Sequence, residues 1–208
     1  MKKIRFIDCG ANVGQSIDWF VNNFEDLENE IIIDSFEANR ELISILEQKV
    51  SYIDENITIH EKGIEVKNST MNFYLQDWGA KTGSSLIKGK SSTNSENFLE
   101  VETIDICNWI NENCDFEQEH IILKLDIEGT EYKVVESLIE NSLNEKITAL
   151  LIEWTPVVKL KESKDFNYTE EDRSRLITLS EEKFKLSLDW QNPNNCVLPL
   201  KNIFETSD

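Results

Sequence analysis

The sequence lacks the residues from which metal sites and disulfide frameworks are built. Its 208 residues include four cysteines and two histidines. The cysteines form no CxxC pair and no zinc-ligand spacing; they are Cys9, Cys107, Cys114 and Cys196. We therefore expect free thiols in a reducing compartment and no required metal ion.

Basic residues are scarce, because 21 Lys and Arg stand against 40 Asp and Glu and leave a net charge of −19. No dense basic run is present. Nucleic-acid binding needs clustered cations that displace counterions from the phosphates. We therefore expect no nucleic-acid partner and interpret the acidic excess as a feature of solubility.

Long apolar segments are missing as well. No apolar run approaches the length that crosses a membrane. The N-terminus starts with basic residues, but its apolar stretch is short and is broken by Arg5 and Asp8, unlike a signal peptide. These absences favour a cytoplasmic protein without a membrane partner, and they leave open whether it forms a homodimer.

Apolar strand-like runs alternate with segments of helical periodicity, which is typical of parallel βαβ units. Buried strands are expected at residues 4–8, 31–36, 57–59, 120–125 and 147–152. Helices are expected at residues 17–24, 42–50, 105–113, 129–140 and 170–182. The pattern predicts one domain over residues 1–208, with a doubly wound, mostly parallel α/β sheet. Residues 1–154 are its expected cofactor-binding core, and residues 155–208 are expected to complete the sheet with a helix and an antiparallel hairpin of residues 183–190 and 196–200.

A polar segment lies between two further predicted strands, residues 70–75 and 98–104. Residues 76–97 are rich in Gly, Ser, Thr and Asn and predict a long loop, which in a compact domain is usually functional or mobile. We expect a lid or acceptor loop in which Trp78, Ser84 and Ser85 contact an acceptor. The alternative is an unstructured loop that contacts no acceptor.

A glycine-containing turn follows the first predicted strand. Glycines at such a turn let the backbone approach a ligand, and the helix after it presents free N–H groups. The GxGxxG spacing of dinucleotide sites is absent, and an acid before GxNxG suits a cationic amino acid better than a pyrophosphate. The candidate ligand-binding residues are Asp8, Gly10, Ala11, Asn12, Gly14 and Gln15. The alternative is that these glycines serve only the packing of the turn and bind no ligand.

Glu37 ends the second predicted strand, 23 residues after Gly14, with Ala38 and Asn39 behind it. An acid at this place can accept two hydrogen bonds from a ribose diol. A solvated carboxylate that caps the next helix is the alternative, and Asn39 suits that role equally well.

The residues Lys124, Asp126, Glu128 and Glu131 follow one another at the carboxyl end of a central predicted strand. Ligands of open α/β sheets bind outside such strand ends. A helix start that favours acids through its dipole is the alternative. Because Lys124 and Asp126 stand in an otherwise apolar strand, we expect a catalytic cluster of Lys124, Asp126 and Glu128, with Glu131 beside the acceptor.

The sequence resembles the FkbM-type methyltransferases, a class I, Rossmann-like family that uses S-adenosylmethionine. The resemblance spans residues 4–154 and rests on DCGANVGQ at 8–15, FEAN at 36–39, GSSL at 83–86, VETID at 101–105 and LKLDIEGTE at 123–131. It implies O-methylation of a hydroxyl on a small acceptor, often a saccharide or a secondary metabolite.

The resemblance also implies roles for individual residues. Asp8, Gly10, Asn12 and Gly14 would hold the methionine part of S-adenosylmethionine, and Glu37 its ribose. Asp126 and Glu128 would lie near the sulfonium and the acceptor, and they are the expected general bases, with Glu131 and His60 as further candidates. Cys9 replaces the usual aliphatic residue, which a small buried thiol tolerates.

Three other functions stay open. One is RNA 2′-O-methylation, which the acidic charge disfavours. Another is binding of S-adenosylmethionine without transfer, since many members of the resembled family carry an N-terminal extension over the acceptor and this chain starts on its first strand. The third is a dinucleotide-dependent oxidoreductase, which the missing GxGxxG disfavours.

Overall fold

The computed structural model describes residues 2–53, 56–77 and 82–205. Six strands form the main sheet: β1 (Lys3–Cys9), β2 (Ile31–Phe36), β3 (Asn56–His60), β7 (Glu119–Leu125), β8 (Ala149–Ile152) and β9 (Ser187–Asp189). Three strands form a smaller sheet: β4 (Gly63–Glu65), β5 (Ser69–Gln76) and β6 (Thr93–Asp105). The α-helices are α1 (Gln15–Phe24), α2 (Arg40–Val50), α3 (Ile106–Asn113), α4 (Glu131–Glu140), α5 (Glu170–Lys183) and α6 (Val197–Glu205).

The main sheet has the strand order β3-β2-β1-β7-β8-β9, and every neighbouring pair is parallel. Phe6 in the central β1 lies opposite Ile33 on one side and Ile122 on the other. The chain moves outward from β1 in one direction through β2 and β3, and in the other from β7 through β8. The strand order therefore reverses between β1 and β7, and crevices for ligands form at the carboxyl end of such a reversal.

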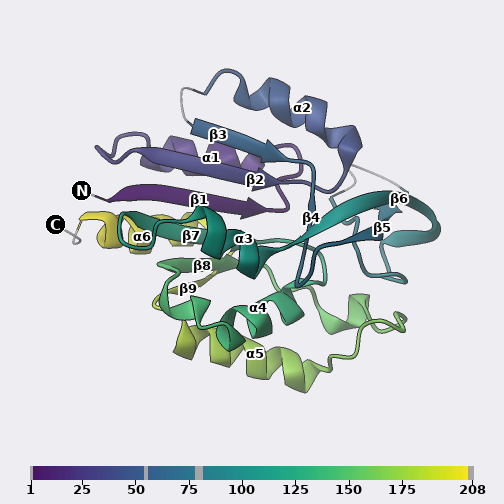
Figure 1. The fold of residues 1–208 in the computed structure, drawn as a ribbon. Coiled ribbons are helices and arrows are strands. Elements are labelled where there is room, and N and C mark those ends of the chain that lie inside the picture. Colours follow the sequence, from purple (N-terminus) through teal and green to yellow (C-terminus); the bar gives the residue numbers. More distant parts are fainter. Residues whose placement is uncertain (1, 54–55, 78–81, 206–208) are drawn as a thin grey trace.

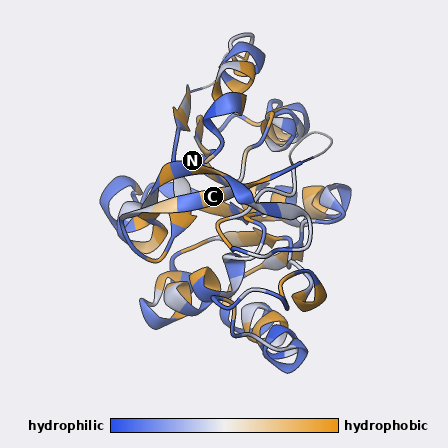
Figure 2. Cartoon of the chain, turned by 90° about the vertical axis from the view of Figure 1, so that its right-hand side faces the viewer, coloured by the Kyte–Doolittle hydropathy of each residue, from blue (hydrophilic) through white to orange (hydrophobic). Residues whose placement is uncertain are grey.

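Helices cover both faces of this sheet because side chains along a buried strand alternate between the faces. Phe6 and Ile122 pack on the side of α1, α2 and α6, where the Phe6 ring stacks on Phe20 with centroids 4.3 Å apart. Ile7 and Leu123, one residue further along each strand, pack on the side of α3, α4 and α5. Figure 1 shows the sheet between these layers, and Figure 2 shows that its helices carry both hydrophobic and hydrophilic residues. The predicted doubly wound α/β architecture is confirmed.

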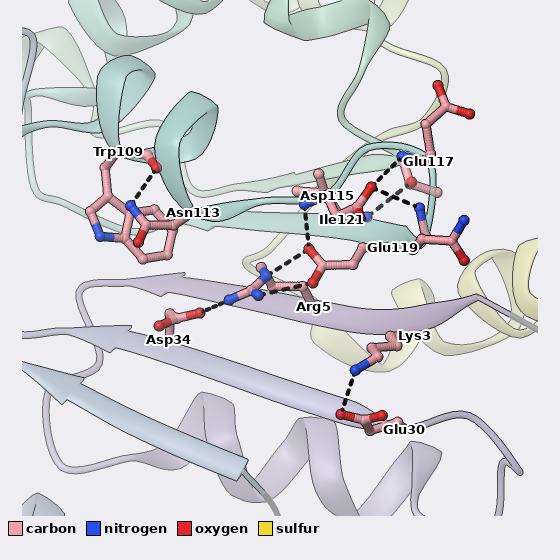
Figure 3. A network of polar contacts seen from close by, with 12 residues as sticks. Lys3, Arg5, Glu30, Asp34, Trp109, Asn113, Asp115, Glu117, Glu119 and Ile121 are labelled. Atoms are coloured by element: carbon pink, nitrogen blue, oxygen red, sulfur yellow. Dashed lines mark hydrogen bonds and ion pairs between the residues drawn. The ribbon is translucent and has the colours of Figure 1, made fainter.

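Arg5 joins the three central strands through buried ion pairs. Its guanidinium donates to Glu119 on β7 at 2.8 and 2.9 Å and to Asp34 on β2 at 2.5 Å (Figure 3). The side chains of Arg5, Asp34 and Glu119 are 13%, 8% and 6% exposed. Hydrogen bonding to Glu119 and the two nearby negative charges raise the pKa of Arg5 despite its partial burial. These contacts hold β1, β2 and β7 together beneath the site.

The smaller sheet lies beside the carboxyl ends of β1, β2 and β3 (Figure 1). Its β5 and β6 are antiparallel, and β4 is parallel to β6. The prediction of a loop over residues 76–97 is wrong at its end, because β6 already begins at Thr93. The first residues of β6 are polar and half-buried or exposed, so they lack the apolar alternation that marks a strand.

The predicted C-terminal antiparallel hairpin is also wrong. β9 pairs with β8 in parallel, with Leu188 opposite Leu151. The second expected strand, residues 196–200, lies instead in a turn and in α6, where Leu200 and Phe204 are buried on one helix face. A four-residue spacing of apolar side chains fits a helix better than a strand. No helix of the described residues is long and apolar enough to cross a membrane.

Candidate active site

A cleft of about 440 Å³ opens at the carboxyl ends of β1, β2, β7 and β8. The smaller sheet and the segment between β5 and β6 line part of it, through residues that include Ile64, Phe73 and Leu86. Its lining also includes Trp19, Trp190 and Pro193. Its volume is typical of sites for small molecules and cofactors, and it lies at the point where the strand order reverses.

The turn between β1 and α1 borders the cleft closely because Gly10 has no side chain. Gly10 adopts a φ of +87°, and a Cβ there would lie 2.0 Å from the carbonyl oxygen of Asp126. The N–H groups of Gly10 and Ala11 both donate to the carbonyl of Phe36 at 3.0 Å. Gly14, with a φ of +84°, is the N-cap of α1. The glycines therefore allow a tight turn that lies directly against the end of β7.

Glu37 lies at the cleft wall and is 5% exposed. Its carboxylate accepts hydrogen bonds from the backbone N–H of Asn12 at 2.8 Å and of Asn39 at 2.7 Å. Burial raises the pKa of Glu37, while these two N–H groups act in the opposite direction. A carboxylate has about four lone-pair sites, so two remain for a ligand. The helix α2 is capped by Asn39 and not by Glu37, because the side chain of Asn39 accepts from the N–H of Glu41 at 3.1 Å.

Lys124 connects the first turn with the end of β7. Its ammonium lies 3.0 Å from Oδ1 of Asp8 and 3.6 Å from Oδ2 of Asp126, and it donates to the carbonyl of Gly10 at 2.8 Å. Burial alone lowers the pKa of Lys124, but Asp8 and Asp126 outweigh burial and leave the pKa raised. Lys124 therefore joins the turn after β1 to the end of β7 at the wall of the cleft.

Glu128 is paired with Lys90, a buried residue of the segment between β5 and β6. Oε2 of Glu128 lies 2.7 Å from the ammonium of Lys90, whose side chain is 1% exposed. Lys90 also donates to the carbonyl of Gly83 at 2.7 Å and to Oγ of Ser92 at 2.8 Å. The buried lysine thus fixes the segment after β5 against the turn after β7. No motif marked Lys90, because the pair joins residues far apart in the sequence.

Most of the candidate residues chosen from the sequence meet at this cleft. Those that line it are Gly10, Ala11, Asn12, Gln15, Glu37, Ala38, Ser84, Lys124, Asp126 and Glu128. Asp8 and Gly14 are not among the residues that line it; Asp8 is fully buried and accepts from Oγ of Ser16 at 2.5 Å. Trp78, expected at the acceptor, lies outside the described residues.

The structure places the other two candidates for the acceptor away from the cleft. Glu131 is fully buried and accepts from the backbone N–H of Gly129 and of Thr155, each at 2.7 Å. Ser85 is also fully buried and donates to the carbonyl of Glu128 at 2.6 Å. Both side chains hold the turns around the cleft and are not positioned to contact an acceptor. Burial also raises the pKa of Glu131 to about 7.

His60, the remaining candidate base, does not line the cleft. Its ring stacks on Phe36 with centroids 4.4 Å apart, and its Nε2 lies 3.0 Å from Oδ1 of Asp34. Among the described residues, no group of three or more His, Cys, Asp or Glu could hold a metal ion. Independence from metal stays a prediction.

Sequence reasoning missed several residues of the cleft, above all Glu153, Trp19 and Trp190. Glu153 directly follows β8, so the rule that selected Asp8 and Asp126 at strand ends applied to it as well. Trp190 could not be found by this rule. It follows the short strand β9, whose sequence pattern predicted one half of an antiparallel hairpin and no parallel strand end.

A family model for the methyltransferase FkbM domain matches residues 8–182, most of the chain. The chain belongs to the FkbM methyltransferase domain family. A crystal structure of methyltransferase FkbM from Methylobacillus flagellatus KT resembles this FkbM domain with a TM-score of 0.42 and 16% sequence identity. The similarity covers 69% of this chain and 30% of that one, so the chain spans under a third of that protein's length. No curated protein sequence matches the chain.

Proposed function

We propose that this FkbM domain transfers a methyl group from S-adenosylmethionine to a hydroxyl of a small acceptor, either a saccharide or a secondary metabolite. One observation carries the proposal: a single cleft joins the buried Glu37 at the end of β2 to the carboxylates Asp126 and Glu128 after β7. A nucleoside diol and a cationic sulfonium need acceptors of these two kinds at the two ends of one site.

The residues of the cleft fit this cofactor. Glu37 would accept hydrogen bonds from the ribose with its free lone pairs, between the apolar Phe36 and Ile64. Asn12 and Asp126 would face the charged methionine part, because backbone and carboxylate groups converge there around Gly10. The cofactor, when bound, supplies a methyl group already activated by the positive sulfur.

The protein then has two tasks. It aligns the acceptor oxygen with the methyl carbon, which lowers the barrier by removing translational and rotational freedom in advance. It also accepts the hydroxyl proton, since a neutral hydroxyl is a weak nucleophile; a positioned base contributes about 10²- to 10⁴-fold. The carboxylates around the end of β7 make this cleft suited to both tasks.

The first test is calorimetric titration of the purified protein with S-adenosylmethionine and, separately, with NAD. We expect S-adenosylmethionine to bind and NAD not to bind. The substitution Glu37→Gln removes the charge and should weaken binding by about 10- to 100-fold, the value of a charged hydrogen bond.

The matched control is Glu171→Gln, which changes an exposed acid on α5. It should leave the affinity unchanged. Binding of NAD, or no binding of S-adenosylmethionine to protein shown to be folded, would contradict the proposed function.

A further inference from the structure

Three carboxylates line the cleft where β7 and β8 end, and two of them have lysine partners. Asp126 lies 3.6 Å from Lys124, and Glu128 lies 2.7 Å from Lys90. The third is Glu153, for which the described residues provide no side-chain hydrogen bond and no ion pair. Of the three carboxylates, Glu153 alone can contact an acceptor hydroxyl without leaving a lysine partner.

Glu153 is placed beside the other two carboxylates by the main sheet. Its backbone N–H donates to the carbonyl of Leu125 at 2.9 Å, so the first residue after β8 lies next to the end of β7. The side chain is half-buried and lines the cleft. Burial raises the pKa of Glu153; the charges of Asp126 and Glu128 raise it further, against weaker opposition from Lys159 and Lys124. A raised pKa brings a carboxylate closer to the working range of a general base.

An aromatic wall borders the same end of the cleft. The rings of Trp19 and Trp190 meet edge to face, with centroids 4.8 Å apart. The backbone N–H of Trp190 donates to the carbonyl of Ile152, the residue before Glu153, at 3.0 Å. The ammonium of Lys124 lies 5.7 Å from the centroid of the Trp190 ring. The wall, Lys124 and Glu153 therefore belong to one neighbourhood.

We propose that this neighbourhood is the acceptor subsite, that Glu153 takes the proton of the acceptor hydroxyl, and that the acceptor is a ring compound without negative charge. The proposal rests on the proposed function. As the acceptor oxygen forms its bond to the methyl carbon, its proton moves to a carboxylate oxygen of Glu153. The electron pair of the broken carbon–sulfur bond stays on sulfur, so charge and atoms balance.

The charge of the subsite disfavours anionic acceptors. Asp126, Glu128 and Glu153 place three carboxylates there, while Lys90 and Lys124 are buried and already engaged by carboxylates and carbonyls. Lys62, which also lines the cleft, is paired with Glu102, and Lys159 is the remaining positive charge near Glu153. A phosphate or carboxylate on the acceptor would therefore meet mainly negative charge, and like charges disfavour binding. A neutral ring gains apolar contact with the tryptophan side chains that line the cleft. The geometry favours a neutral sugar ring or a phenolic ring over sugar phosphates and uronic acids.

The test measures formation of S-adenosylhomocysteine with a panel of acceptors. The neutral set contains methyl glycosides of hexoses and deoxyhexoses and simple phenols, and the anionic set contains hexose phosphates and uronic acids. The wild type should turn over at least one neutral compound, with the anionic compounds at least tenfold slower. Glu153→Gln should lower kcat by about 10²- to 10⁴-fold, while its affinity for S-adenosylmethionine stays within about twofold.

Two further readouts separate chemistry from structure. The kcat of the wild type should rise with pH to a plateau as Glu153 loses its proton, and Glu153→Gln should lack that limb. Trp190→Leu should raise the KM for the acceptor more than it lowers kcat. The control Glu171→Gln, on exposed α5, should behave as the wild type.

Several results would overturn the proposal. They are a Glu153→Gln variant within about threefold of the wild-type kcat, a preference for the anionic acceptors, or binding of S-adenosylmethionine without turnover of any neutral compound. Failure of the folded wild type to bind S-adenosylmethionine would instead refute the proposed function itself, which keeps the two failures distinguishable.

Discussion

Gly10 shows how one residue makes the cleft possible. It combines a left-handed backbone with a close approach to the end of β7, where a Cβ would lie 2.0 Å from the Asp126 carbonyl oxygen. The left-handed backbone conformation alone destabilises a residue that has a Cβ by about 1–2 kcal/mol. The close approach adds a steric overlap with backbone, which no rotamer change relieves.

We therefore expect Gly10→Ala to destabilise the protein by more than about 2 kcal/mol and to weaken binding of S-adenosylmethionine. Gly89→Ala is the matched control, because Gly89 also has a positive φ of +82° but its Cβ would have 3.3 Å to the nearest atom. Urea unfolding midpoints measure both. Equal losses for the two variants would show that the contact with Asp126 is not what requires glycine.

Two ion-paired residues of β1 differ in how deeply their ion pairs are buried. Lys3 and Arg5 lie on the same strand, and each forms an ion pair (Figure 3). The pair of Lys3 with Glu30, at 2.9 Å, is 45% and 56% exposed. The contacts of Arg5 with Asp34 and Glu119 are largely buried. Loss of one partner leaves an uncompensated charge only at the buried site.

Arg5→Met should therefore lower the free energy of unfolding by about 3–5 kcal/mol, because Asp34 and Glu119 stay buried without their cation. Lys3→Met on the same strand should cost less than about 1 kcal/mol. Chemical denaturation at neutral pH compares the two. A small loss for Arg5→Met would mean that water or His60 replaces the guanidinium.

At the scale of the whole molecule, the pH dependence of stability reports on Glu131. This carboxylate joins the turns after β7 and β8, and burial raises its pKa to about 7 from an ordinary 4.5. The folded state therefore holds the proton more tightly than the unfolded state. Stability from this group is full below pH 4.5 and is lost as the pH rises to about 7.

We expect the wild type to lose about 3 kcal/mol relative to Glu131→Gln between those two pH values. Glutamine offers only one acceptor oxygen to two N–H donors, so the variant is less stable throughout, and the difference in slope is the quantity to measure. Thermal unfolding at several pH values gives this slope. Parallel curves for the two proteins would contradict the raised pKa.

Some residues of the candidate site could be predicted from the sequence, and others could not. Residues at strand ends, such as Glu37, Lys124 and Asp126, could be predicted because parallel strands bring their carboxyl ends to one edge. Glu131, in the same acidic run, was expected beside the acceptor, but it is fully buried and does not line the cleft. Its direction depends on the turn at Glu128, which has a φ of +56°, and on the distant N–H of Thr155.

The sequence by itself determined the alternation of strands and helices, the doubly wound sheet and the motifs of the first turn, because local periodicity and strand ends carry those signals. Only the tertiary structure decided the parallel pairing of β9, the Lys90–Glu128 pair and the meeting of Glu153 with Trp190. These contacts join residues distant along the chain. Their energy comes from burial and charge in the folded state, and no local pattern records which partners will meet.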